Sequence, residues 1–177
     1  MVATVEDFER SKEFFESGDI LNTIESYEKA INQIERTKAV KEEELIDFLN
    51  KILKYCKENN LQNEEAMVLR ALGRTYTKFK QYPLGLKYSY QSLKIQKKLG
   101  KKLDIAESLV FLAEDLEVSG NYDECIKSFS EAAGIFHELG KLRKEKDIKK
   151  EISRLKEFSK EMTEDEYLLH KFNIDKY

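Results

Sequence analysis

The sequence predicts an all-α fold of stacked helical units, and three observations lead to this prediction. Charged residues make up 37% of the 177 residues, with one proline and seven glycines, which is typical of long solvated helices. Apolar residues recur at intervals of three and four, and no stretch alternates with a period of two; one such stripe contains Leu45, Leu49, Ile52, Leu53 and Cys56. Many residues also match at a fixed separation of 40, which indicates a repeat architecture.

The helices can be followed in order because their boundaries have local causes. The turn pair Gly18-Asp19 combines a residue that tolerates positive φ with one that can cap the next helix. Pro83 suits the first turn of a helix, and Gly100 and Gly140 are typical C-terminal caps. We predict helices over residues 5–17, 20–36, 41–58, 61–79, 83–99, 103–118, 122–139 and 142–160, and a short one over 164–171 that begins at a capping box.

The repeat is clearest between residues 66 and 140. Large residues, small residues and turn glycines all match at this spacing; the pairs include Ala66 and Ala106, Leu69 and Leu109, Leu72 and Leu112, Tyr82 and Tyr122, Leu99 and Leu139, and Gly100 and Gly140. A unit of this size buries its apolar face only against its neighbours, so stacked units share one core.

These units resemble tetratricopeptide repeats. In that family, the first helix of a repeat carries a large apolar residue, a Leu-Gly pair and an aromatic residue, and the second helix carries a small residue that nests against it. One unit has these features at Leu69, Leu72, Gly73, Tyr76, Tyr82, Gly85 and Ser92. The next has them at Leu109, Leu112, Ala113, Leu116, Gly120, Tyr122, Cys125 and Ala132. A degenerate first unit contains Phe14, Gly18, Thr23, Ile24, Tyr27 and Ala30.

The resemblance implies a right-handed αα superhelix of the long-period subclass, with repeats of about 40 residues. It divides the chain into a degenerate first repeat (1–36), an extra helix (37–60), two tetratricopeptide-like repeats (61–140), and a capping helix followed by a short C-terminal helix (141–177). The extra helix leaves open whether the two repeat portions share one continuous groove.

The resemblance also implies a partner-binding groove on the inner face of the superhelix, lined by the first helix of each repeat. The ten positions that carry over are Met67, Arg70, Arg74, Thr77, Lys78, Glu107, Val110, Glu114, Glu117 and Val118. Basic residues share a face of one helix, and acidic residues cluster on the next. Two interpretations stay open: the charges pair with each other across the groove, or they form a bipolar groove that orients a peptide carrying both signs.

One specialisation of the family does not fit this sequence. Repeats that bind the C-terminal carboxylate of heat-shock chaperones use Lys, Asn and Arg at set positions. Here those positions hold Phe8, Lys12, Ala71, Glu107 and Phe111, so we do not expect this chaperone motif as a partner.

The sequence offers no arrangement of residues typical of catalysis or metal binding. His137 and His170 are the only histidines and do not form a His-Glu-x-x-His motif. Cys56 and Cys125 lie within apolar helical patterns, which is typical of buried, inert thiols in a reducing compartment. We therefore expect a cytoplasmic protein that is not an enzyme and has no cofactor or metal. The net charge of −3 does not favour nucleic acid, and no apolar run is long enough for a membrane span.

The predicted helix 142–160 combines an apolar stripe with many lysines. We interpret it as a cap that shields the last repeat. A self-association seam over residues 142–162 and a basic patch for an acidic partner or nucleic acid are the alternatives. The function expected from the whole sequence is an adaptor or scaffold that binds a peptide or helix of another protein. A transcription-linked regulator acting through this basic helix is the alternative, and a self-associating structural protein is a third interpretation.

Overall fold

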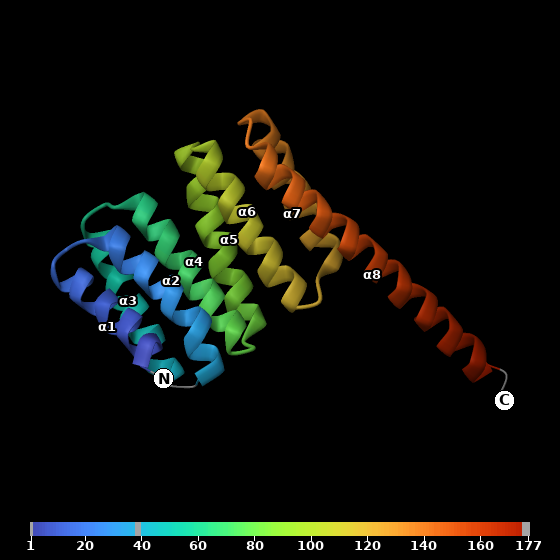
Figure 1. Cartoon of the computed structure of the whole chain (residues 1–177), viewed down its shortest axis with the longest axis horizontal. Helices are drawn as coiled ribbons and strands as arrows, with labels where there is room; N and C mark the ends of the chain where they lie inside the picture. The colour runs from blue at the N-terminus through green and yellow to red at the C-terminus, as the bar shows by residue number, and fades with distance from the viewer. Residues whose placement is uncertain (1, 38–39, 175–177) are drawn as a thin grey trace.

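The computed structural model describes the backbone of residues 2–37 and 40–174, and the side chains of residues 6–32 and 40–162. Within these ranges, all regular secondary structure is α-helical (Figure 1). The helices are α1 (Val2–Glu16), α2 (Ile20–Thr37), α3 (Glu42–Glu58), α4 (Gln62–Lys78), α5 (Tyr82–Leu99), α6 (Lys102–Val118), α7 (Tyr122–Glu138) and α8 (Leu142–Ile174). The first seven follow the predicted bounds to within three residues. None of the helices in the described ranges is apolar enough over a sufficient length to span a bilayer.

Neighbouring helices form pairs that stack side by side (Figure 1). The most extensive contacts are those of α4 with α5, α6 with α7 and α1 with α2. Contacts of α5 with α6 and of α7 with α8 join one pair to the next. Because α4 also contacts both α2 and α6, these three helices follow one another along a single face of the stack.

Helix α3 lies in the same register as α5 and α7. The three helices begin at residues 42, 82 and 122. Each is followed by a residue with positive φ, and these residues, Asn60, Gly100 and Gly140, are again 40 apart. The sequence interpretation had α3 as an extra helix between repeats, whereas its bounds continue the 40-residue register toward the N-terminus.

Side-chain size explains why this register is hidden in the sequence. Three buried positions of α3 are large where the matching positions of α5 are small: Leu45 against Gly85, Leu49 against Ser89, and Ile52 against Ser92. Large side chains keep helix axes apart, so α3 does not approach α2 as closely as α5 approaches α4. Helix α3 therefore keeps the 40-residue period but lacks the close helix packing that α5 makes with α4.

The contact between α4 and α5 is made by small residues. A Cβ atom on Gly73 would collide with Oγ of Ser89, and one on Gly85 would collide with Oγ1 of Thr77. Glycine at both positions lets the two backbones meet, because a Cβ would hold them apart. Gly73 thus lies at the contact between the paired helices α4 and α5.

The buried side chains of the described residues form two clusters. The first spans α1 to α4 and is rich in aromatic rings, with the ring of Phe8 centred 5.4 Å from that of Phe48 and 6.2 Å from that of Tyr27. The hydroxyl of Tyr27 forms a 2.8 Å hydrogen bond with that of Thr75, which joins α2 to α4. The second cluster spans α5 to α8, and Leu155 on α8 is fully buried in it.

Helix α8 is continuous over Leu142–Ile174, so the predicted break between residues 160 and 164 is wrong. This segment contains neither glycine nor proline, and nothing in it obliges the backbone hydrogen bonds to stop at the predicted capping box. The first half of α8 packs against α7, and the second half extends beyond the other helices (Figure 1).

Candidate protein-binding groove

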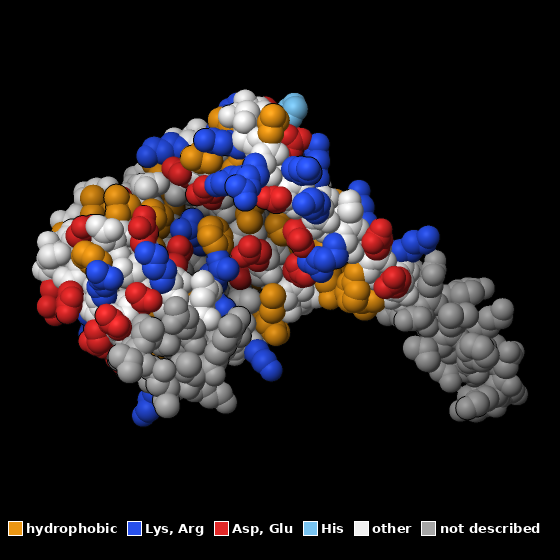
Figure 2. Space-filling model, viewed as in Figure 1, with side chains coloured by type: hydrophobic (Ala, Val, Ile, Leu, Met, Phe, Trp, Pro, Cys, Tyr) orange, Lys and Arg blue, Asp and Glu red, His pale blue; other side chains and the backbone are white. Residues whose placement is uncertain are grey.

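The inner face of the stack, between α2 and the first half of α8, is hollowed in the space-filling view (Figure 2). Two pockets lie along this groove. We call the first the anchor pocket, with a volume of about 440 Å³ and a lining of Glu28, Arg70, Glu107, Val110, Phe111, Phe136, Lys144, Asp147 and Ile148. We call the second the polar pocket, with a volume of about 370 Å³ and a lining of Arg74, Thr77, Lys78, Lys80, Tyr82, Glu114, Asp115 and Val118.

The anchor pocket has apolar walls within a charged rim. Its apolar lining residues are Val110, Phe111, Phe136 and Ile148, contributed by α6, α7 and α8. The guanidinium of Arg70 lies 4.2 Å from the centre of the Phe111 ring, and that of Arg74 lies 4.8 Å from it. Both cations are attracted to the ring quadrupole, which holds the Phe111 side chain in place.

Four ion pairs cross between helices along the groove, and we call them the ion-pair ladder. They are Arg70 with Glu28 (2.9 Å), Arg74 with Glu114 (3.1 Å), Lys144 with Glu107 (2.7 Å) and Arg154 with Glu117 (2.7 Å). The first joins α2 to α4, the second joins α4 to α6, and the other two join α6 to α8. Five of the charged residues predicted for the groove are therefore paired across it.

The pair of Arg70 with Glu28 is the most protected of the four. Both Nε and Nη2 of Arg70 donate to the same carboxylate oxygen of Glu28, at 3.1 and 2.9 Å. The Arg70 side chain is only 13% exposed, whereas the lysine and arginine side chains that α8 contributes are about half exposed. Screening by solvent weakens an exposed pair, so this one contributes more than the others.

The polar pocket contains a buried carboxylate. The hydroxyl of Ser89 donates a 2.6 Å hydrogen bond to Oδ2 of Asp115, which joins α5 to α6. Burial raises the pKa of Asp115, because desolvation disfavours its charged form. The hydrogen bond from Ser89 and the positive charges of Arg74 and Lys78 oppose this rise.

Eight of the ten residues predicted for the groove line the two pockets. Arg70, Glu107 and Val110 line the anchor pocket, and the polar pocket takes Arg74, Thr77, Lys78, Glu114 and Val118. The Thr77 side chain is buried, 6% exposed, and lies at the contact with Gly85 of α5. The remaining two lie outside both pockets: Met67 packs against the first core cluster, and Glu117 pairs with Arg154 of α8.

Sequence reasoning missed the residues that other helices bring to the anchor pocket, namely Glu28, Phe136, Lys144, Asp147 and Ile148, and also Phe111 on α6. One signal was available for α8. Asp147 lies 40 residues after Glu107, so one further step of the period assigns it to the groove. No such signal existed for Glu28, because α2 belongs to the degenerate first unit.

The thiols and the described histidine lie away from the groove. Cys56 and Cys125 are buried and free. Burial raises the pKa of each thiol to about 11, so both stay protonated at neutral pH. Nδ1 of His137 lies 3.0 Å from a carboxylate oxygen of Glu145, and neither residue lines the anchor pocket or the polar pocket. The described residues contain no group of three or more His, Cys, Asp or Glu side chains that could hold a metal ion.

Neither a protein-family model nor a curated protein matches the sequence, whereas solved structures do. A Rap protein complexed with Competence and Sporulation Factor matches with a TM-score of 0.62 and 14% identity over 95% of this chain and 52% of its own. The apo form of RapI matches with a TM-score of 0.52 and 16% identity over 78% of this chain and 57% of its own. The chain thus spans about half the length of these Rap proteins.

A third match is a signal transduction ATPase with numerous domains from Pyrococcus horikoshii, which has a tetratricopeptide repeat sensor. Its TM-score is 0.56, with 17% identity over 82% of this chain and 25% of its own. At such identities the likeness concerns the fold and not the activity. The chain is therefore an all-α helical repeat protein that is similar to tetratricopeptide repeat proteins, a fold that commonly mediates protein–protein interactions.

Proposed function

We propose that this protein is a non-enzymatic adaptor or scaffold that binds a peptide or helix of another protein in its groove. The observation that carries the proposal is the anchor pocket, an apolar-walled cavity of about 440 Å³ on the inner face. Its size lies within the range of pockets that bury a ligand group, and its position between successive helices is where helical proteins hold partners.

The chemistry of the pocket favours a partner with a large apolar anchor residue. Burying an aromatic or aliphatic side chain against Val110, Phe111 and Ile148 removes apolar surface from water, which is the main source of affinity at interface hot spots. The rim charges contribute less, because Arg70 and Lys144 are already paired within the chain. Binding is therefore proposed to depend on the anchor more than on charge steering.

The rim still provides one charge for orientation. Asp147 lines the anchor pocket, and among the described residues it has no ion-pair or hydrogen-bond partner. A Lys or Arg next to the anchor residue of the partner would pair with it. We therefore propose a partner motif in which a large apolar residue and a cation lie close together.

The fold neighbours and the register support the same proposal. One neighbour is a Rap protein in complex with Competence and Sporulation Factor, and we propose that this chain likewise binds a protein or peptide. The 40-residue register of α3, α5 and α7 supports the long-period subclass and its right-handed superhelix. The two buried free thiols support a cytoplasmic setting.

Peptides selected from a random phage-displayed library against the full chain would test the groove. Each selected peptide is synthesised with a fluorophore and titrated by anisotropy against the wild type, Phe111→Ala and Tyr90→Ala. Phe111→Ala is expected to weaken binding by about tenfold or more, because it removes a wall of the anchor pocket. Tyr90→Ala, an aromatic truncation of a 44% exposed residue on α5, is the matched control and should leave affinity unchanged.

A charge exchange tests the orientation. Asp147→Lys should lower the affinity for peptides that carry a cation beside the anchor residue. Replacing that cation by Glu in the peptide should restore its affinity for the Asp147→Lys variant. Peptides that bind Phe111→Ala as tightly as the wild type would show that the groove is not the binding site. Failure to select any peptide would also count against the proposal.

A further inference from the structure

The two ends of the helical array differ in charge. Helices α1 and α3 lie at one end and α8 at the other (Figure 1). Helix α1 carries five carboxylates and two cations, and α3 carries five and three. Between residues 142 and 162, α8 carries eight cations and five carboxylates. In Figure 2, acidic side chains gather at the left end over α1, and basic ones gather along the start of α8.

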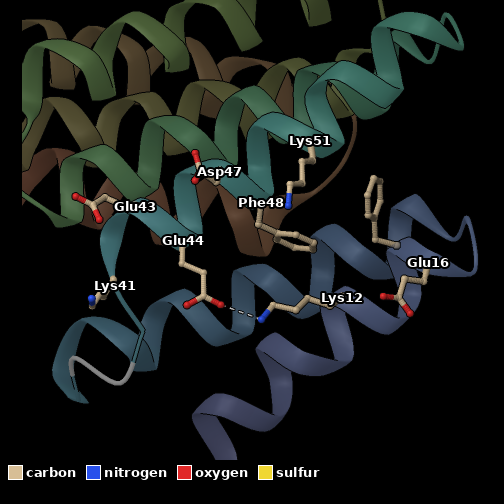
Figure 3. Close-up of a pocket in the computed structure, with 9 residues that line it drawn as sticks. Lys12, Glu16, Lys41, Glu43, Glu44, Asp47, Phe48 and Lys51 are labelled. Carbon is tan, nitrogen blue, oxygen red and sulfur yellow. Dashed lines mark hydrogen bonds and ion pairs between the residues drawn. The ribbon is translucent and has the colours of Figure 1, made fainter.

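A crevice of about 700 Å³ separates α1 from α3, and we call it the α1–α3 crevice (Figure 3). Its lining is Lys12, Phe15, Glu16, Lys41, Glu43, Glu44, Asp47, Phe48 and Lys51. Aromatic rings hold the two helices apart, since the ring of Phe15 is centred 5.9 Å from that of Phe48 and 5.8 Å from that of Tyr55. Lys12 reaches across from α1 to Glu44 on α3 at 2.9 Å (Figure 3).

Of the four carboxylates that line the crevice, only Glu44 has a partner among the described residues, Lys12. Within the described ranges, Glu16, Glu43 and Asp47 form no ion pair or hydrogen bond through their side chains, although Lys41 and Lys51 also line the crevice. Charges that are unpaired within the chain are available to a second molecule without any prior cost of breaking a pair.

Helix α8 has an uncovered face at the opposite end. In α6, the residues Ala106, Leu109, Ala113 and Leu116 are buried in the cluster that α6 shares with α7. Forty residues later, the same positions of α8 hold Lys146, Lys149, Ser153 and Lys156, all exposed. We call this surface, together with Lys150, the outer face of α8. Of its four lysines, only Lys149 has an ion-pair partner among the described residues, Glu145.

We propose that the outer face of α8 in one copy docks into the α1–α3 crevice of a second copy. A convex helix meets a concave crevice, and unpaired lysines meet unpaired carboxylates. The aliphatic stems of the lysines can cover the rings of Phe15 and Phe48 while the ammonium groups reach Glu43 and Asp47. Because the two surfaces lie at opposite ends of the same chain, the contact is head to tail and extends into open chains instead of closing as a dimer.

Sedimentation velocity of the full chain tests the proposal over a range of protein concentrations, at ~50 mM and ~500 mM NaCl. At low salt, the average mass should rise with concentration and pass that of a dimer. At high salt, the mass should fall to that of the monomer, because screening weakens contacts between exposed charges. The result does not depend on the groove, so it stands or falls separately from the proposed adaptor function.

Charge reversal at each end makes the test specific. The double variant Glu43→Lys with Asp47→Lys changes the crevice, and Lys146→Glu with Lys150→Glu changes α8. The self-association of each double variant should be weaker than that of the wild type by about tenfold or more. Mixing the two should restore association, because one supplies an intact α8 and the other an intact crevice. Lys94→Glu with Lys98→Glu on α5 is the control, since it has the same residues and spacing on another exposed surface.

Three outcomes would overturn the proposal. The first is a monomer at every concentration and salt. The second is a crevice variant that associates like the wild type, which would indicate a symmetric contact of α8 with α8. The third is a monomer whose Lys146 and Lys150 bind duplex DNA in anisotropy titrations, with affinity that falls as salt rises. This last result would assign the outer face of α8 to nucleic acid.

Discussion

The backbone of Gly73 in α4 lies directly against the hydroxyl group of Ser89 in α5. The same hydroxyl donates a hydrogen bond to Asp115 in α6. Because Gly73 has no side chain, Ser89 can make two contacts. The Ser89 side chain packs against α4, and its hydroxyl donates to the buried carboxylate of Asp115 on α6. Three consecutive helices of the repeat array meet at this point.

Replacing Gly73 by leucine should destabilise the fold. The added side chain cannot fit between α4 and α5, and overpacking of this kind costs about 1–3 kcal/mol. Urea unfolding followed by circular dichroism measures the change. Gly134→Ala on α7 is the control, since a Cβ there meets no atom within 4 Å; it should raise stability by about 0.5–1 kcal/mol through helix propensity. Equal midpoints for Gly73→Leu and the wild type would contradict the packing described above.

Asp115→Asn should stabilise the protein at neutral pH. Burial raises the pKa of Asp115 in the folded state. The contribution of this side chain to the free energy of unfolding is therefore most favourable below pH 3.8, the ordinary pKa of the group, and is lost as the pH rises through the raised pKa. The amide oxygen can still accept the hydrogen bond from Ser89. Urea midpoints at several pH values should show a difference between variant and wild type at neutral pH and none below 3.8. Glu25→Gln, on the exposed side of α2, is the control, and its urea midpoint should equal that of the wild type at every pH. A lower midpoint for Asp115→Asn than for the wild type at neutral pH would mean that the charge of Asp115 strengthens the hydrogen bond from Ser89 enough to outweigh the cost of desolvation.

The pair of Arg70 with Glu28 should show measurable coupling. A double-mutant cycle with Arg70→Gln and Glu28→Gln is expected to give a coupling free energy of about 1 kcal/mol, because both side chains are mostly shielded and two N–H groups donate to one carboxylate oxygen. Lys54 with Glu58 on α3, at 3.8 Å and largely exposed, is the matched control and should give about 0–0.5 kcal/mol. Indistinguishable couplings would mean that the contact of Arg70 with Glu28 is no stronger than an ordinary surface pair.

Leu155→Ala should show that α8 is part of the core. Leu155 is fully buried against the second cluster, and truncation of such a leucine costs about 2–5 kcal/mol. Leu142→Ala, at a position 63% exposed on the same helix, should change stability by less than about 0.5 kcal/mol. Thermal and urea unfolding give both values. If the two variants were equally stable, α8 would be an appendage and not a cap of the last repeat.

The first seven helices and their order were predictable because most of their boundaries have a local chemical cause. Glycines at residues 18, 100, 120 and 140 all take positive φ in the structure. Two boundary features were not predictable from local signals. The positive φ of Lys80 lies between α4 and α5, where a lysine gives no warning of a turn. The continuity of α8 past residue 160 was missed because a capping-box sequence can also lie inside a helix.

The groove was only partly predictable, since the first helix of each repeat supplies part of it. The resemblance assigns Arg70 and Val110 to the groove, and in the structure both line the anchor pocket, on α4 and α6. It does not reveal that α7 and α8 close the anchor pocket with Phe136 and Ile148, which depends on how successive pairs stack. The pairing of Arg70 with Glu28 was also hidden, because α2 does not follow the consensus of the repeat.

The ion-pair ladder also has a mechanical consequence. Each of its exposed pairs contributes about 0.2–1 kcal/mol, which is close to the thermal energy of about 0.6 kcal/mol at room temperature. We therefore expect the ion pairs of Arg74 with Glu114 and of Arg154 with Glu117 to break and re-form readily. Their separation does not require the side chains of the apolar clusters to unpack. Under the proposed function, the groove can widen as these ion pairs separate one at a time while the apolar clusters stay packed, so a bulky side chain of a partner can enter without unfolding of the helices.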